Sequence, residues 1–183
     1  VLAPPPTFPA ACSGASVNNA MCRQNYLTLN DRKVPFTDAA EGSSAIVDLD
    51  QPLEVVAVPG VGAEEDYAGI DVTGKAALIL RGEISFSDKV ANAQSHGAAA
   101  ALVYDNEDSA QLITMQIENA SIPSAFIGKA DGEAAAALLA AGETVTLAAS
   151  ADNVQIVTYP EAGPMSSFSS WGPTSTLSIK PEI

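Results

Sequence analysis

The chain alternates between short apolar runs and turn-forming residues, a pattern typical of a strand-rich domain. From position 45 onward, runs rich in β-branched residues are bounded by Gly, Pro and Asp, and each run predicts a strand. Two runs, 76–80 and 98–103, are apolar throughout, which indicates burial on both faces of a sheet. The predicted strands are Ala45–Leu49, Leu53–Val58, Ala76–Leu80, Ala99–Tyr104, Ser124–Ile127, Thr144–Ala148 and Val154–Tyr159.

Two helices interrupt these strands. The first is predicted over residues 86–96, where Ser85 and Asp88 resemble a capping box at its start and Gly97 is placed to end it. The second is predicted over residues 128–142 and is also closed by glycine. The strands on either side of the first helix are separated by enough chain for a right-handed parallel crossover. The sequence therefore predicts strand–helix–strand units within a chain that has more strands than helices.

The beginning and the end of the chain differ from this central pattern. The first residues are rich in Pro, Ala and Asn, and one strand pair is expected there, at Tyr26–Leu29 and Arg32–Phe36. The intervening Asn30-Asp31 suits a tight turn, because both residue types tolerate positive φ. The last residues are rich in Ser, Gly and Pro, which indicates a boundary. We therefore expect a flank at 1–44, a domain at 45–159 and a second flank at 160–183.

Composition narrows the classes of partner. The chain has 183 residues, 47% of them hydrophobic, and a formal net charge of −14, so it can bury a core and repels polyanions. Nucleic acid and anionic membrane surfaces are therefore not expected as partners. No run reaches the roughly 20 apolar residues that a membrane span needs. The chain opens with Val1 and a proline run, which we interpret as a piece of a longer protein and not as an argument against secretion.

The two cysteines, Cys12 and Cys22, lie close together in sequence. They are too few for a zinc site, because the single histidine, His96, is far away and no other soft ligand accompanies them. A local disulfide is the more economical interpretation, and it would stabilise the fold by roughly 2–3 kcal/mol. Such a bond favours an extracellular location. Two buried free thiols are the alternative.

No catalytic set is apparent in the sequence. A Ser-His-Asp system needs a base, and His96 falls in the last turn of the first predicted helix, where the helix dipole favours a cation. The glycines at Gly60–Gly62 and at Gly74 do not match a phosphate-binding loop. The acidic clusters at 64–66 and 105–108 offer oxygen ligands that Ca²⁺ prefers but lack EF-hand spacing. Solvated loops without a cofactor are therefore expected, and a bound calcium ion is the alternative.

One modification pattern is present. Asn119-Ala120-Ser121 is an acceptor sequence for N-glycosylation, which would place this loop at the surface of a secreted eukaryotic protein.

The order of these signals resembles the protease-associated (PA) domain family. In that family a Gly-Lys-hydrophobic strand leads into an Arg-Gly-x-x-x-Phe turn and then a helix, as residues 74–86 do here. The resemblance covers about 45–159 and implies an α+β fold. This fold is a strand-rich open barrel, or two packed sheets, with two flanking helices and parallel strand–helix–strand units. The matching positions are Gly74, Arg81, Gly82, Phe86, Gly97 and Pro123.

A second resemblance concerns the end of the chain. Residues 167–174, which include Gly172 and Pro173, and residues 180–183 are similar to a segment of subtilisin-like serine proteases that precedes the nucleophilic serine. Trp171 stands where many members carry Arg. The resemblance implies that both flanks derive from a secreted subtilisin-like endopeptidase and that this chain holds none of its triad residues.

Together the two resemblances imply a non-catalytic module that controls substrate access. Its expected partners are the protein or peptide substrates of the parent protease and the catalytic domain of that protease. Two alternatives remain: a stand-alone PA-type recognition or sorting domain, and a part of a serine peptidase that is active only in the full chain.

Overall fold

The computed structural model describes residues 20–40, 43–109 and 112–159. The predictions for Cys12, Gly172, Pro173 and the flank at 160–183 lie outside these residues, as does the side chain of Cys22.

Eight strands, two α-helices and two 3₁₀ helices make up the described residues. In chain order they are β1 (Ala20–Leu29), β2 (Arg32–Asp38), η1 (Ile46–Asp48), β3 (Leu53–Ala57), η2 (Glu64–Tyr67), β4 (Ala76–Leu80), α1 (Phe86–Ser95), β5 (Ala100–Tyr104), β6 (Ser124–Ile127), α2 (Lys129–Ala140), β7 (Thr146–Ala148) and β8 (Val154–Tyr159).

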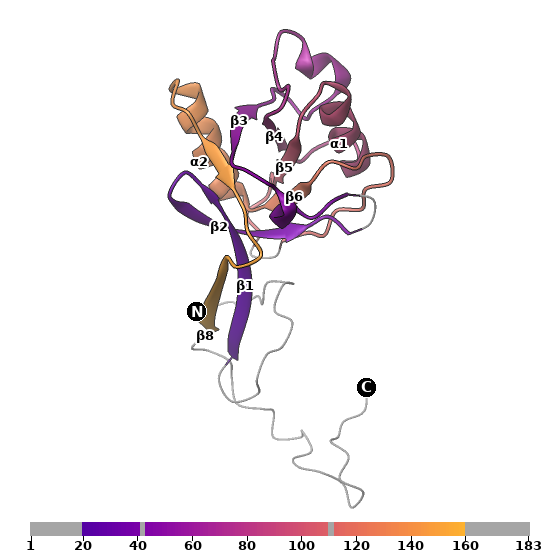
Figure 1. The fold of residues 1–183 in the computed structure, drawn as a ribbon. Coiled ribbons are helices and arrows are strands. Elements are labelled where there is room, and N and C mark those ends of the chain that lie inside the picture. The colour runs from indigo at the N-terminus through magenta and orange to yellow at the C-terminus, as the bar shows by residue number, and fades with distance from the viewer. Residues whose placement is uncertain (1–19, 41–42, 110–111, 160–183) are drawn as a thin grey trace, which may run out of the picture.

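The strands form a ring (Figure 1). Their order is β2-β6-β5-β4-β3-β7-β1-β8, and a further pairing of β1 with β2 closes the first seven into a barrel. Strands β3, β4, β5 and β6 run parallel to one another, whereas the remaining pairs are antiparallel. The expected α+β class and the barrel are therefore confirmed, and the ring is closed by the hairpin of β1 and β2.

This hairpin corrects the expected domain boundary. Its register pairs Leu29 with Arg32, and Asn30 between them has a φ of 51°. The four side chains Leu27, Leu29, Val34 and Phe36 belong to the hydrophobic core. Residues 20–38, which we expected to lie in the flank, are therefore part of the same fold.

One predicted strand, Ala45–Leu49, is wrong. The segment forms the 3₁₀ helix η1, in which the backbone N–H of Asp48 donates to the carbonyl of Ala45 at 3.1 Å. The N–H of Ile46 donates to Oδ1 of Asp38 at 2.9 Å instead of to a neighbouring strand. A side-chain acceptor therefore holds this apolar run in a turn.

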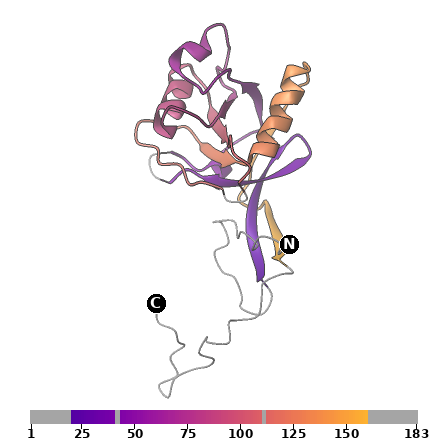
Figure 2. The same cartoon turned by 180° about the vertical axis from the view of Figure 1, so that it is seen from behind.

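The two helices cover different parts of the barrel wall (Figure 2). Buried side chains of β4 alternate between two apolar clusters, with Ala76 and Leu78 in the cluster next to α2, and Ala77 and Ile79 in the cluster next to α1. The prediction that this strand is buried on both faces is thus confirmed. Ser85 caps α1 by accepting a hydrogen bond from the N–H of Asp88 at 3.1 Å.

A two-stranded ribbon leaves the barrel at one end (Figure 1). The first half of β1 pairs with β8 from Ala20↔Tyr159 to Asn25↔Val154. Both ends of the described fold therefore lie side by side at the far end of this ribbon.

Candidate binding surface at the carboxyl ends of the parallel strands

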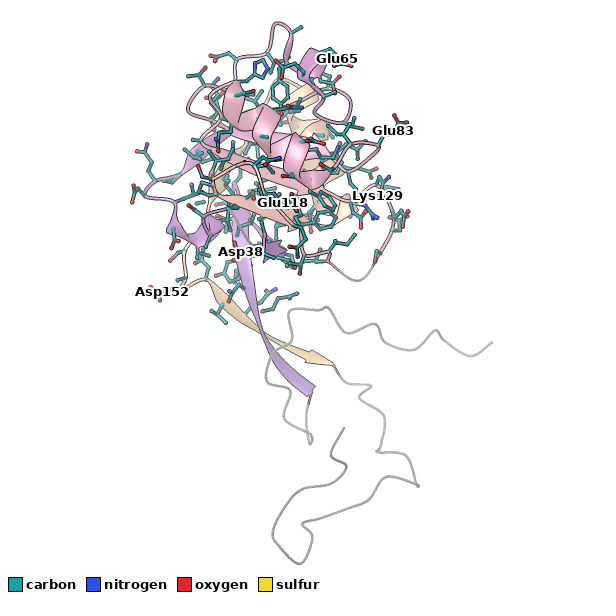
Figure 3. The ribbon with its side chains drawn as sticks, turned by 90° about the vertical axis from the view of Figure 1, so that its right-hand side faces the viewer. Asp38, Glu65, Glu83, Glu118, Lys129 and Asp152 are labelled. Atoms are coloured by element: carbon teal, nitrogen blue, oxygen red, sulfur yellow. The ribbon has the colours of Figure 1, made fainter. Side chains whose placement is uncertain are left out.

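The carboxyl ends of the four parallel strands meet at one edge of the barrel wall, the position at which open α/β sheets bind ligands. The loops that follow β4 and β5, together with the start of α2 after β6, bring charged residues to this edge. Figure 3 shows Glu83 and Lys129 on the same side of the domain, away from Asp152. We call the set Arg81, Glu83, Asp105, Glu107, Asp108 and Lys129 the carboxyl-edge surface.

An ion pair between the partly exposed Arg81 and the buried Asp105 forms the base of this surface. Nη1 of Arg81 donates to Oδ1 of Asp105 at 2.8 Å, and the residue Asp105 is only 1% exposed. The same carboxylate oxygen accepts from the N–H of Glu107 at 3.2 Å, while the N–H of Asp105 donates to the carbonyl of Ile127 at 3.1 Å. Because the N–H of Arg81 also bonds Tyr104, the pair joins the ends of three adjacent strands.

Carboxylates dominate the outer part of the carboxyl-edge surface. The side chains of Glu107 and Asp108 are 73% and 89% exposed, and Glu83 is also exposed. Lys129 lies 3.9 Å from Asp108 and offsets one of these charges. Since the guanidinium of Arg81 is engaged with Asp105, the surface presents net negative charge to solvent, which attracts basic groups on a partner.

Beside this surface, a buried lysine holds the loop that follows β3. Lys89 of α1 is fully buried, and its Nζ donates to the carbonyl of Val61. Burial lowers the pKa of Lys89 to about 8, although the nearby Asp66 carboxylate opposes this shift. The Arg-Gly turn packs against the same loop, because a Cβ on Gly82 would lie 2.5 Å from Cγ1 of Val61. The sequence did not predict the burial of Lys89, since a lysine in an amphipathic helix normally faces solvent.

Two of the three carboxylates in the first acidic cluster, those of Glu64 and Asp66, are engaged with the protein itself. Oδ2 of Asp66 accepts from the N–H groups of Val61 and Ala63 at 3.1 and 2.9 Å. Oε1 of Glu64 lies 3.1 Å from Nε2 of His96. Within the part of the chain that the structure describes, no group of three or more His, Cys, Asp or Glu side chains could hold a metal ion.

His96 contacts two residues of η2, Tyr67 and Glu64, and these contacts support the fold. It is the C-cap residue of α1, as the sequence predicts, and its ring stacks on Tyr67 with centroids 4.6 Å apart. Together with Glu64, these contacts fix the η2 segment against the end of α1.

The remaining positions of the family pattern support the fold. Gly74 and Gly97 have φ values of 69° and 84° at the turn before β4 and at the end of α1. The Phe86 ring meets Phe126 edge-on at 5.8 Å, and the carbonyl of Pro123 accepts from the N–H of Ala101 at 2.9 Å.

Two further positions concern the loop before β6 and the second helix. Asn119 is exposed, and its backbone N–H donates to Oγ of Ser87 at 3.2 Å. Gly132 allows α2 to approach β5 closely, because a Cβ there would overlap the Tyr104 side chain. Sequence reasoning missed this contact, although a glycine inside a helical pattern is a signal for it.

The barrel and its two helices define an α+β domain. The sequence model of the PA domain family matches residues 15–135, and the chain belongs to this family.

Curated relatives of the chain are peptidases. It is 40% identical over 121 residues to a C5a peptidase of Streptococcus pyogenes, which covers 66% of this chain and 10% of that protein. It is 36% identical over 126 residues to the minor extracellular protease Vpr of Bacillus subtilis, covering 68% and 15% of the two chains. With the PI-type proteinase of Lactococcus lactis the identity is 33% over 124 residues, covering 67% and 6%. The chain therefore spans only a small part of these relatives.

Solved structures share the fold. A zinc aminopeptidase from Bacillus subtilis superposes with a TM-score of 0.57 and 27% identity, over 74% of this chain and 33% of that one. An aminopeptidase from Aneurinibacillus sp. strain AM-1 gives 0.54 and 29%, over 78% and 36%. Among the described residues, no helix combines the length and the apolar character that crossing a membrane requires.

Proposed function

We propose that this domain is a non-catalytic module that controls protein-substrate access in a secreted subtilisin-like serine endopeptidase. The observation that carries the proposal is its membership of the PA domain family, together with 33–40% identity to peptidases over two thirds of the chain. A rigid domain beside a catalytic cleft narrows access and contacts remote parts of a substrate. Such contacts change KM and selectivity more than the chemical step.

The proposal that the parent enzyme is subtilisin-like rests on a different observation. The motif at residues 167–174 resembles subtilisin-like proteases, and the name of the Vpr relative describes it as extracellular. The structural likeness to aminopeptidases, one of them a zinc enzyme, supports a second candidate, in which the same domain accompanies a metallopeptidase. Reading the encoding gene on both sides of these residues distinguishes the two.

The test exchanges charge on the carboxyl-edge surface of the full-length parent enzyme. Glu83, Glu107 and Asp108 are replaced by Lys, and hydrolysis of a basic protein substrate is compared with hydrolysis of a small peptide ester. We expect kcat/KM for the protein to fall by about tenfold, mainly through KM, because attraction at the carboxyl-edge surface becomes repulsion. Hydrolysis of the ester should be unchanged.

A matched control variant changes the net charge of the domain by the same amount at a different place. Asp48, Asp50 and Asp152 are also exposed, and they lie away from the carboxyl-edge surface, with Asp48 and Asp50 preceding β3 and Asp152 on another side of the domain. Replacing these three by Lys should leave both substrates within about twofold of the wild-type enzyme. Equal losses in both triple variants, or a parallel loss with the ester, would contradict the proposed role.

The absence of catalysis in the isolated chain has its own test. Treating the purified chain with a fluorophosphonate probe should give no labelled serine, because such probes require an activated nucleophile. Stoichiometric labelling would show that this chain is a peptidase itself.

A further inference from the structure

A groove lies between the second helix and the turn of the β1–β2 hairpin, apart from the carboxyl-edge surface. Its volume is about 420 Å³, within the size range of ligand sites. Buried side chains of Leu29, Ala135 and Val145 line it, and Leu138, which is 37% exposed, stands at its side. We call it the hairpin–helix groove. It is lined by Leu29, Asn30, Asp31, Arg32, Asp131, Ala134, Ala135, Leu138 and Val145.

The groove is held open from the hairpin side. Nδ2 of Asn30 donates to the carbonyl of Thr144 at 3.2 Å, and Oδ1 of Asn30 accepts from the N–H of Thr146 at 2.8 Å. The N–H of Asn30 also donates to the carbonyl of Thr146 at 2.8 Å. These three bonds fix the turn against residues 144–146 at the start of β7, so the turn cannot fold over the apolar lining.

A second clamp fixes the distance between the hairpin and the helix. Nε and Nη2 of Arg32 lie 2.7 and 2.5 Å from Oδ1 of Asp131, in the first turn of α2. A ligand therefore meets a preformed groove, which lowers the entropic cost of binding.

Charge identifies the kind of partner. The residues that line the groove include two carboxylates, Asp31 and Asp131, and one cation, Arg32, which leaves a formal charge of −1. The cation, Arg32, is already paired with Asp131. Asp31 is exposed, and within the described residues its side chain has no ion-pair partner. An apolar lining with an acidic rim complements an aliphatic side chain that is flanked by lysine or arginine.

We propose that the hairpin–helix groove binds an extended peptide segment in which an aliphatic side chain is flanked by basic residues. The aliphatic side chain packs against Leu29, Val145 and Leu138, and a neighbouring cation faces Asp31. The inference rests on the proposed interaction function, for which it names the class of segment recognised and a second surface of contact.

The test measures binding of a labelled peptide to the whole 183-residue chain by fluorescence anisotropy. The probe has one leucine with two lysines on each side. One control peptide replaces the leucine by serine, and another replaces the lysines by glutamates. We expect the serine peptide to bind about tenfold more weakly and the glutamate peptide to show no binding. Equal affinity for the leucine and serine peptides would overturn the inference, as would no binding of the leucine peptide.

Two alanines of α2 provide matched variants. Ala134 lines the groove, whereas Ala137 is exposed and does not. Ala134→Phe fills the groove and should weaken peptide binding by about tenfold or more, while Ala137→Phe should leave it within about twofold. Leu138→Ser removes an exposed contact and should also weaken binding, so the test does not depend on the fold accepting a larger side chain. Unchanged affinity in both Ala134→Phe and Leu138→Ser would refute the assignment.

Three other outcomes separate this inference from its alternatives. If sedimentation shows a dimer that Ala134→Phe dissolves, a second copy of the chain fills the groove and the proposed occupant is wrong. If Ala134→Phe abolishes peptide binding but the parent enzyme keeps its discrimination among protein substrates, the groove binds the peptide and the proposed substrate-access function is refuted for this surface. If peptide binding fails while the carboxyl-edge variants lose discrimination, the proposed function stands without the groove.

Discussion

Burial of Lys89 predicts an unusual dependence of stability on pH. Lysine has a pKa of 10.5 in an unfolded chain, whereas burial lowers the pKa of Lys89 to about 8 in the fold. At neutral pH, keeping the ammonium buried therefore costs about 3 kcal/mol of folding free energy relative to the neutral amine. Between the two pKa values the unfolded state binds more protons than the folded state, so the free energy of unfolding rises with pH.

The expected size of this effect follows from the same two pKa values. Integrating the proton difference from about pH 7.5 to about pH 9.5 gives a gain of about 2 kcal/mol in the free energy of unfolding. Urea unfolding followed by circular dichroism at several pH values measures it. Burial and nearby carboxylates raise the pKa of Tyr67, but tyrosine ionisation in the unfolded chain lowers stability only above about pH 10, outside this window.

The variant Lys89→Met isolates the contribution. Methionine has a similar length and no charge, so the rise with pH should disappear. Near pH 7.5 the loss of the buried charge stabilises the variant, while the unpaired carbonyl of Val61 costs about 1–3 kcal/mol, and the two effects nearly cancel. Lys33→Met is the control, because Lys33 is exposed and its Nζ lies over the Tyr26 ring. If Lys89→Met keeps the pH slope of the wild type, the lysine is not buried as described.

Two further predictions concern packing and the ion pair between Arg81 and Asp105. Gly132→Val should destabilise the fold by about 1–3 kcal/mol in thermal or urea unfolding, because the added carbons overlap Tyr104 and force α2 away from β5. A gain in stability would show that α2 shifts freely. Asp105→Ala should cost about 2–3 kcal/mol, because it leaves the half-buried Arg81 and the N–H of Glu107 without their acceptor. A double-mutant cycle with Arg81→Ala should show coupling between the two residues, and additive losses would contradict a direct pair.

The elements that sequence reasoning located well have local causes. Strands β4 and β6 have the bounds expected from their apolar runs, and α1 begins at the residue after Ser85 as its capping box predicts. These signals lie within a few residues of one another, so they need no knowledge of distant contacts.

The features that sequence reasoning missed depend on contacts between distant segments. Residues 20–38 look like a flank by composition, yet β1 pairs with β7 and β8, which lie more than 100 residues later in the chain. The burial of Lys89 requires the loop at Val61 to cover α1. The hairpin–helix groove likewise requires Asn30 to meet Thr144 and Thr146. Periodicity within a single element contains none of this information.

The paired ends of the β1–β8 ribbon have a consequence for how such a domain combines with other proteins. Ala20 and Tyr159 face each other on adjacent strands, so their Cα atoms are separated by only about 5 Å. A surface loop of a recipient protein can therefore be opened at one peptide bond and rejoined through this domain with little displacement of either cut end. The ribbon thus allows the barrel to be inserted into loops of unrelated proteins. Grafting residues 20–159 into an exposed turn of another enzyme should preserve both folds.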